Sequence, residues 1–172
     1  TEDLVSLHHE LRKIAPEARL LIVGGFDPGH EWFKQLEKRA RQVGNVEFLG
    51  RVDHQTLVAA YRAADVLVSM SEHEGFGVPL VEAMACDLPV LAFGAAAVPE
   101  TMGGRGIVFD AKNFAALAEL VKLISRDRSL HEKLLLGQRE RLKELSFDNT
   151  VQALGRALGV SRGDQSKQKP LK

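Results

Sequence analysis

The sequence has 172 residues, enough for one domain with a sizeable core, and 45% of them are apolar, as in ordinary globular proteins. Its 23 basic and 23 acidic side chains give a formal net charge of zero, which argues against a nucleic-acid partner. No apolar run approaches the roughly 18 residues of a membrane span, and the single cysteine excludes an intramolecular disulfide, so we expect a cytoplasmic domain.

The first half of the chain alternates helical and extended patterns. Apolar residues recur at helical spacing in some segments and form short continuous runs in others. The elements predicted from these patterns are, in order, a helix at 3–15, a strand at 19–23, a helix at 29–43, a strand at 46–50 and a helix at 54–64. Asp53 precedes the last of these helices and is expected to cap it.

The second half begins with the same alternation and ends in helices. The elements predicted there are strands at 65–70, 89–93 and 106–109, and helices at 79–85, 113–126, 129–145 and 148–158. The residues at 161–172 are polar and predict a disordered tail, which leaves one domain at 1–160. Because nearly every strand is continuously apolar and helices alternate with strands, we expect an α/β fold: a Rossmann-like parallel sheet with helices on both faces.

The segment at 65–86 concentrates the features that point to a ligand. It runs strand, turn, helix, and ligands of open parallel sheets bind where strands end and helices begin. Gly75 and Gly77 allow positive φ and a close approach to the backbone, and Pro79 suits the first helical position. Such a turn is expected to leave backbone N–H groups free to bind an anion, namely those of Gly77, Val78, Leu80 and Val81.

Two glutamates flank this turn. Glu74 lies on the turn itself and Glu82 lies eight positions later, in the first part of the helix. Carboxylates accept hydrogen bonds from hydroxyl groups, so the pair fits a ligand with hydroxyls at both ends and phosphate between, as in a nucleotide sugar. Two glutamates at this spacing are by themselves usually solvated side chains; the strand, glycines and proline in register favour the functional interpretation.

The stretch EGFGVPLVE at 74–82, preceded by ADVLVSMSEH, resembles the donor-binding motif of the group 1 (family 4) glycosyltransferases. The segments LLIVGG, VEFLGRV, LVAAYRAAD, VPET, GIVFD and LSFDNT are similar to that family in order, so the resemblance covers about 3–158. It implies a GT-B enzyme, in which two Rossmann-like lobes enclose the active site, and it identifies this chain with the C-terminal, donor-binding lobe.

The resemblance also implies roles for particular residues. Glu74 would be the catalytic residue, orienting the hexose and stabilising charge, and Glu82 would bind the ribose. The donor sugar and phosphates would meet Gly75, Phe76, Gly77, Val78, Pro79 and Leu80. The base or the cleft would be lined by Gly24, Gly25, Arg51 and Val52, and the sugar would also touch Glu100. From the residues alone, Arg51 is equally a surface side chain, Gly24–Gly25 a plain turn and Glu100 a helix or loop carboxylate.

The implied activity is retaining transfer of a hexose from a UDP- or GDP-linked sugar to a glycan, lipid or small acceptor, with no metal and no other cofactor. The acceptor would bind through an N-terminal lobe, and the full-length enzyme is expected to associate with a membrane surface. The donor-binding half alone would be inactive.

The sequence departs from the family pattern in several places, including Met70, which stands where proline is usual. The family has a strand ahead of residue 1, so we expect a fragment of a longer enzyme in which the strands at 19–23 and 65–70 flank a gap. Asp87 stands where a left-handed glycine is usual, and Ala95 and Ala96 replace a glycine pair.

Other functions stay open. The same fold could serve as a non-catalytic nucleotide-binding or interaction module, as a nucleotide-sugar epimerase or as a phosphorolytic enzyme. A dinucleotide-dependent oxidoreductase is disfavoured, because LLIVGGFDPG lacks the G-x-G-x-x-G spacing. The six histidines show no metal-ligand spacing.

Overall fold

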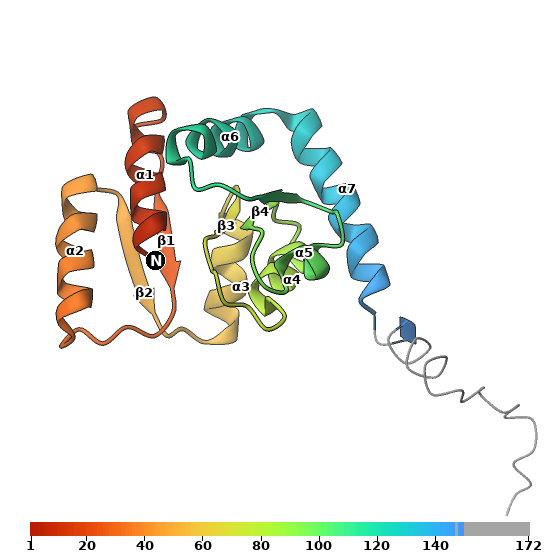
Figure 1. The fold of residues 1–172 in the computed structure, drawn as a ribbon, viewed down its shortest axis with the longest axis horizontal. Helices are drawn as coiled ribbons and strands as arrows, with labels where there is room; N and C mark the ends of the chain where they lie inside the picture. Colours follow the sequence, from red (N-terminus) through yellow and green to blue (C-terminus); the bar gives the residue numbers. More distant parts are fainter. Residues whose placement is uncertain (147, 150–172) are drawn as a thin grey trace, which may run out of the picture.

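The computed structural model describes residues 1–146 and 148–149, in which helices and strands alternate (Figure 1). The strands are β1 (Leu20–Val23), β2 (Val46–Gly50), β3 (Leu67–Ser69), β4 (Val90–Phe93) and β5 (Ile107–Phe109). The helices are α1 (Glu2–Ile14), α2 (Glu31–Val43), α3 (His54–Ala63), α4 (Val78–Ala85), α5 (Val98–Met102), α6 (Phe114–Arg126) and α7 (Arg128–Glu144). None of the helices in this part of the chain is both long and apolar enough to cross a membrane.

Every element predicted within this range is present, with ends that differ by no more than two residues. Asp53 caps α3 as expected, because its carboxylate accepts a hydrogen bond from the Thr56 N–H at 2.7 Å. The short helix α5 was not predicted. The predicted tail at 161–172 and nearly all of the helix predicted at 148–158 lie outside the described residues, as does the predicted domain end at residue 160.

The five strands are parallel but form two separate sheets. β1 pairs with β2, and β4 lies between β3 and β5. The Cα partners include Leu20 with Val46, Leu67 with Val90, and Leu91 with Ile107. Because β1 and β3 share no ladder, the gap predicted between these two strands is confirmed.

Helix α1 packs against both sheets. Its Val5 lies in an apolar cluster with Ile22 of β1 and with the apolar side of α2. Its Leu7 lies in a second cluster with Leu91 of β4 and Leu117 of α6. Apolar residues of α1 therefore pack against both sheets, and the helix spans the break between them.

Helices cover both faces of the three-stranded sheet, as predicted. α1 and α6 lie on one face. On the other face, Val90 and Ala92 of β4 pack with Leu80 and Met84 of α4 and with Met102 of α5, all of them buried. The two-stranded sheet is less covered, because Leu21 and Val23 of β1 are 36% and 37% exposed.

Among the described residues, three positions other than glycine adopt left-handed backbone: Asn45, Asp87 and Ala96. Asp87, the second residue after α4, has a φ of +56°, so this position is left-handed as the family pattern requires, and its carboxylate pairs with Arg139 at 2.7 Å. Ala96, in the loop before α5, has a φ of +51°. An alanine pays a steric penalty in this region because its Cβ approaches the following carbonyl oxygen.

Helix α1 also closes the end of α2 through two polar side chains. The buried His8 donates a hydrogen bond from Nε2 to the Gly44 carbonyl oxygen at 3.2 Å, and Arg12 donates to the Val43 carbonyl oxygen. Burial lowers the pKa of the His8 imidazole below 6.5, and the hydrogen bond to Gly44 offsets this only in part. The folded protein therefore resists protonation of His8 more than the unfolded chain does.

Replacing Ala96 by glycine is expected to stabilise the fold. The substitution removes a left-handed alanine, and the net gain in the free energy of unfolding is about 0.5 kcal/mol because glycine also loses more backbone entropy on folding. Urea unfolding measures this change. Ala97→Gly is the matched control: Ala97 has an ordinary φ of −80°, so glycine there should destabilise. Equal effects of both substitutions would contradict the assignment of strain to Ala96.

Stability is expected to fall as the pH drops below 6.5, because the unfolded chain then binds a proton at residue 8 that the folded chain resists. The contribution of His8 is fully present above pH 6.5 and is lost as the pH falls toward its lowered folded pKa. Thermal unfolding between pH 7.5 and pH 5 measures it. His8→Gln should flatten the profile, whereas His9→Gln, at an exposed position, should not. A His8→Gln profile as steep as that of the wild type would refute this account.

Candidate functional site

The turn between β3 and α4 has the left-handed backbone that glycine permits at one of its two glycines, Gly77. Gly77 is left-handed, with φ +76° and ψ +48°, and a Cβ at this position would lie 2.9 Å from Leu80 Cδ1. A side chain at residue 77 would therefore suffer both backbone strain and a clash. Gly75 is not left-handed, but a Cβ there would meet no atom within 4 Å, so its surroundings are open. Helix α4 begins at Val78, and Pro79 takes the second helical position, one later than predicted.

One of the four N–H groups expected to be free is already engaged. The Leu80 N–H donates to the Gly77 carbonyl oxygen at 2.9 Å, and the Leu80 side chain is buried in the core. The expectation that the Leu80 N–H is free is therefore wrong, because the first turn of α4 closes on itself. Phe76 and Val78, on either side of Gly77, are by contrast 49% and 55% exposed.

The two glutamates of the motif differ in their surroundings. Glu74 is half-buried, and within the described part of the chain its carboxylate accepts no hydrogen bond. Glu82 is also half-buried, but its Oε2 accepts a hydrogen bond from the Tyr61 hydroxyl at 3.0 Å. Burial and the neighbouring Glu82 raise the pKa of the Tyr61 phenol, so this hydroxyl remains a donor.

The ends of β1 and β2 form a second candidate surface. The Gly24 N–H donates to the Gly50 carbonyl oxygen at 3.0 Å, so the loops after both strands start side by side. The Arg51 side chain lies directly over Gly25, where a Cβ would come within 2.7 Å of Arg51 Nε. The predicted proximity of Gly24, Gly25 and Arg51 is thus observed.

These loops enclose a hollow of about 590 Å³ that includes Gly25 and Arg51. Its inner wall is aromatic: Phe26, Phe33 and Phe48 pack with ring centroids 5.1–5.3 Å apart. This aromatic wall was not predicted. Gly24 and Val52, assigned to the same cleft by the resemblance, are not among the residues that line the hollow.

The turn at 71–77 and the hollow are separate features on one side of the molecule. In Figure 1, the loops that follow β1, β2 and β3 all run along the lower side. Neither Glu74 nor Glu82 lines the hollow. The motif residues therefore lie on one turn, and the loop residues of the other sheet lie on the same side of the molecule. The two groups do not line a common cavity.

Helix α5 supports the turn from behind. The Ala97 N–H donates to the Glu74 carbonyl oxygen at 3.3 Å, and the Thr101 hydroxyl donates to the Phe76 carbonyl oxygen. Glu100 lies on the same helix with an exposed side chain, and its carbonyl oxygen accepts a hydrogen bond from Arg141 Nη2 at 2.7 Å. Sequence reasoning missed Thr101 and the hydroxyl of Tyr61, because both find their partners far along the chain.

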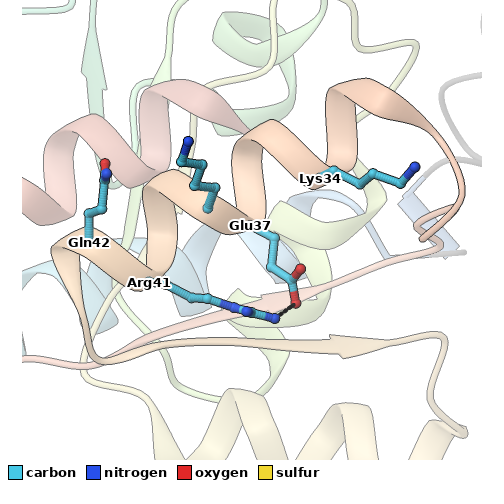
Figure 2. A pocket seen from close by; sticks show the side chains of 5 residues that line it. Lys34, Glu37, Arg41 and Gln42 are labelled. Carbon is cyan, nitrogen blue, oxygen red and sulfur yellow. Dashed lines mark hydrogen bonds and ion pairs between the residues drawn. The ribbon is translucent and has the colours of Figure 1, made fainter.

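A second hollow, of about 370 Å³, lies on the outer side of α2. Figure 2 shows that its lining side chains all come from that one helix; they are Lys34, Glu37, Lys38, Arg41 and Gln42. Arg41 pairs with Glu37 at 2.9 Å, as expected for exposed charges one helical turn apart. None of the predicted site residues lines this hollow. Among the residues that the structure describes, no group of three or more His, Cys, Asp or Glu side chains could hold a metal ion.

Several known proteins are similar to this chain in sequence or in structure. The O-antigen chain mannosyltransferase B of Escherichia coli is 32% identical over 115 residues, which are 67% of this chain and 30% of that protein. The crystal structure of the C-terminal domain of the group 1 glycosyl transferase LpcC from Francisella tularensis has a TM-score of 0.71 and 26% identity, over 83% of this chain and 76% of that one.

HepE of Anabaena, solved in complex with UDP-glucose, has a TM-score of 0.74 at 21% identity, over 92% of this chain and 44% of that one, which shows the shared fold. The chain spans about a third of the length of the curated relatives it matches. The family described as glycosyl transferases group 1 matches residues 2–141. Because that match takes in every strand of both sheets, the chain belongs to the group 1 glycosyltransferases.

Proposed function

We propose that this chain is the donor-binding half of a retaining hexosyltransferase that takes its hexose from a UDP- or GDP-linked sugar. The relatives support both donor types. A Corynebacterium glutamicum relative, 30% identical over 129 residues, is a GDP-mannose-dependent mannosyltransferase, and HepE was solved with UDP-glucose. The acceptor is a glycan, a lipid or a small molecule, as the O-antigen and phosphatidylinositol mannoside relatives suggest.

The observation that carries this function is the half-buried Glu74 carboxylate on the turn that opens α4. A carboxylate that has lost part of its hydration needs hydrogen-bond donors, and Glu74 has none within the described residues. The hydroxyl groups of a hexose are donors of this kind. Phe76, exposed beside it, offers the apolar surface against which a sugar ring packs.

The start of α4 suits the diphosphate. With the Leu80 N–H engaged, the N–H groups of Gly77 and Val78 are the ones closest to the opening of the helix, and Pro79 has none. The helix dipole favours an anion at this end by about 0.3–1 kcal/mol before direct hydrogen bonds are counted. The left-handed Gly77 lets the phosphates approach the backbone without meeting a side chain.

The nucleoside fits the remaining groups. Glu82 accepts hydrogen bonds from the ribose diol, and Tyr61 holds its carboxylate in place through the 3.0 Å hydrogen bond. The base enters the hollow beside Arg51 and Gly25, where an aromatic wall favours a flat ring. Glu100 on α5 completes the sugar contacts.

Catalysis in this proposal is electrostatic. Backbone N–H groups stabilise the leaving diphosphate, and Glu74 orients the hexose and stabilises positive charge at its reacting carbon. No protein nucleophile, metal or other cofactor is required of these residues. The acceptor binds to a second lobe, so this chain alone binds the donor without transferring the sugar.

Nucleotide sugars are expected to raise the melting temperature of the chain. Binding stabilises the folded state by RT ln(1 + [L]/Kd), about 2.7 kcal/mol at a hundred times Kd. A panel of UDP-glucose, GDP-mannose, free glucose and NADH, each at millimolar concentration, tests this by thermal shift. At least one nucleotide sugar should act and free glucose should not. If NADH alone raised the melting temperature, the oxidoreductase would replace this proposal.

Replacing Glu82 by glutamine is expected to weaken binding of that nucleotide sugar about fivefold, because the amide oxygen still accepts a hydrogen bond but one that is about 1 kcal/mol weaker than a bond to the carboxylate. Isothermal titration calorimetry measures the change. Glu119→Gln on α6 is the matched control, since Glu119 is an exposed carboxylate far from the motif in the sequence. Unchanged affinity in Glu82→Gln would remove Glu82 from the ribose site.

A further inference from the structure

We propose that Thr101 is a positioning residue for the donor-binding turn: its hydroxyl fixes the peptide group between Phe76 and Gly77 so that the Gly77 N–H faces the donor. Because Thr101 acts on that turn, its role rests on the donor-binding function proposed for the chain. Thr101 touches no donor atom itself. It acts through the backbone of the turn.

The hydrogen bond from Thr101 sets the direction of one peptide plane. Thr101 is 2% exposed, and its Oγ1 donates to the Phe76 carbonyl oxygen. The carbonyl of Phe76 and the N–H of Gly77 belong to the same planar peptide unit and point in opposite directions. When the carbonyl is held toward α5, the N–H is therefore directed away from α5, to the open side of the turn.

A second hydrogen bond orients the peptide group two residues earlier. The Ala97 N–H holds the Glu74 carbonyl oxygen at 3.3 Å, which directs the N–H of Gly75 away from α5 as well. The surroundings of Gly75 are open on the other side. Without these two bonds, the glycines would leave the turn free to adopt several backbone conformations, because glycine populates both halves of φ space.

Helix α5 can act as a support because it is itself held from both sides. Val98 and Met102 are buried in the core cluster under the three-stranded sheet. Arg141 of α7, whose side chain is 16% exposed, donates from Nε to the Thr101 carbonyl oxygen at 3.0 Å and from Nη2 to the Glu100 carbonyl oxygen at 2.7 Å. A continuous polar connection thus runs from α7 through α5 to the turn.

The test separates the hydroxyl of Thr101 from its bulk. Thr101→Val keeps the shape and removes the donor, which leaves a carbonyl oxygen without its partner; Thr101→Ser keeps the donor. Gln138→Met is the control for a general loss of buried hydrogen bonds: Gln138 bonds the backbone of Leu88 and Val90 at 2.9 and 2.8 Å and does not touch the turn. The readouts are the Kd of UDP-glucose or GDP-mannose, whichever stabilises the wild type, and amide hydrogen exchange at Leu80 and Ala97, whose N–H groups donate to the Gly77 and Glu74 carbonyl oxygens of the turn.

Thr101→Val is expected to raise the Kd about tenfold, since one net hydrogen bond corresponds to about a factor of ten. It should also speed exchange at Leu80 and Ala97, because a loosened turn opens the hydrogen bonds that protect these two amides. Thr101→Ser should restore the Kd to within about twofold, as expected if the hydroxyl carries the effect. Gln138→Met should lower the melting temperature while leaving the Kd of the folded protein unchanged. A Thr101→Val Kd within about twofold of wild type, or an equal rise in Gln138→Met, overturns the role.

The failure of this role and the failure of the donor function look different. If the wild type binds neither nucleotide sugar, the donor function fails, and the exchange rates of Leu80 and Ala97 in Thr101→Val against Gln138→Met still decide whether Thr101 holds the turn. Should Thr101→Val not fold, Thr101→Cys replaces it, with a similar volume and a weak donor; its Kd should rise about threefold. Exchange at Leu80 and Ala97 as slow as in the wild type would then count against the role.

Discussion

The packing of α1 against both sheets is the interaction on which the arrangement of the candidate site depends. β1 and β3 share no backbone ladder, so hydrogen bonds between strands do not fix one sheet relative to the other. Val5 on one side of α1 contacts the cluster of β1, and Leu7 contacts the cluster of β4. The position of the hollow after β1 relative to the turn after β3 is therefore set by side-chain packing. Such packing can fix a position because protein interiors are close-packed and leave few voids.

Within this frame, the site is built from backbone more than from side chains. The glycines of the turn supply a conformation that other residues resist, and neighbouring elements then select one of the conformations that glycine allows. Tyr61 and Thr101 have comparable roles. The Tyr61 hydroxyl orients the Glu82 carboxylate, and the Thr101 hydroxyl orients the Phe76 carbonyl. The Glu82 carboxylate is thus held by a residue outside the motif, whereas Glu74 is held only through its backbone carbonyl oxygen, which accepts from the Ala97 N–H.

The spacing of apolar residues was enough to predict the long helices, because α1, α6 and α7 each bury apolar residues at helical intervals. The matching motif residues were enough to predict the family. α5 escaped prediction because five residues are too few to show a helical period. Leu80 was assigned to the ligand because it lies in the motif, yet α4 must bury one face and Leu80 is on it. The hydroxyls of Tyr61 and Thr101 could not be predicted, since their partners lie 21 and 25 positions away and local patterns carry no such information.

The break between the sheets leaves one edge of β1 without a strand partner among the residues that the structure describes. Along this edge, backbone donors and acceptors lie next to Leu21 and Val23, which are partly exposed. A further β-strand can add to such an edge through backbone hydrogen bonds. A strand that adds there would also cover these two apolar side chains, so backbone pairing and apolar burial would favour the same alignment.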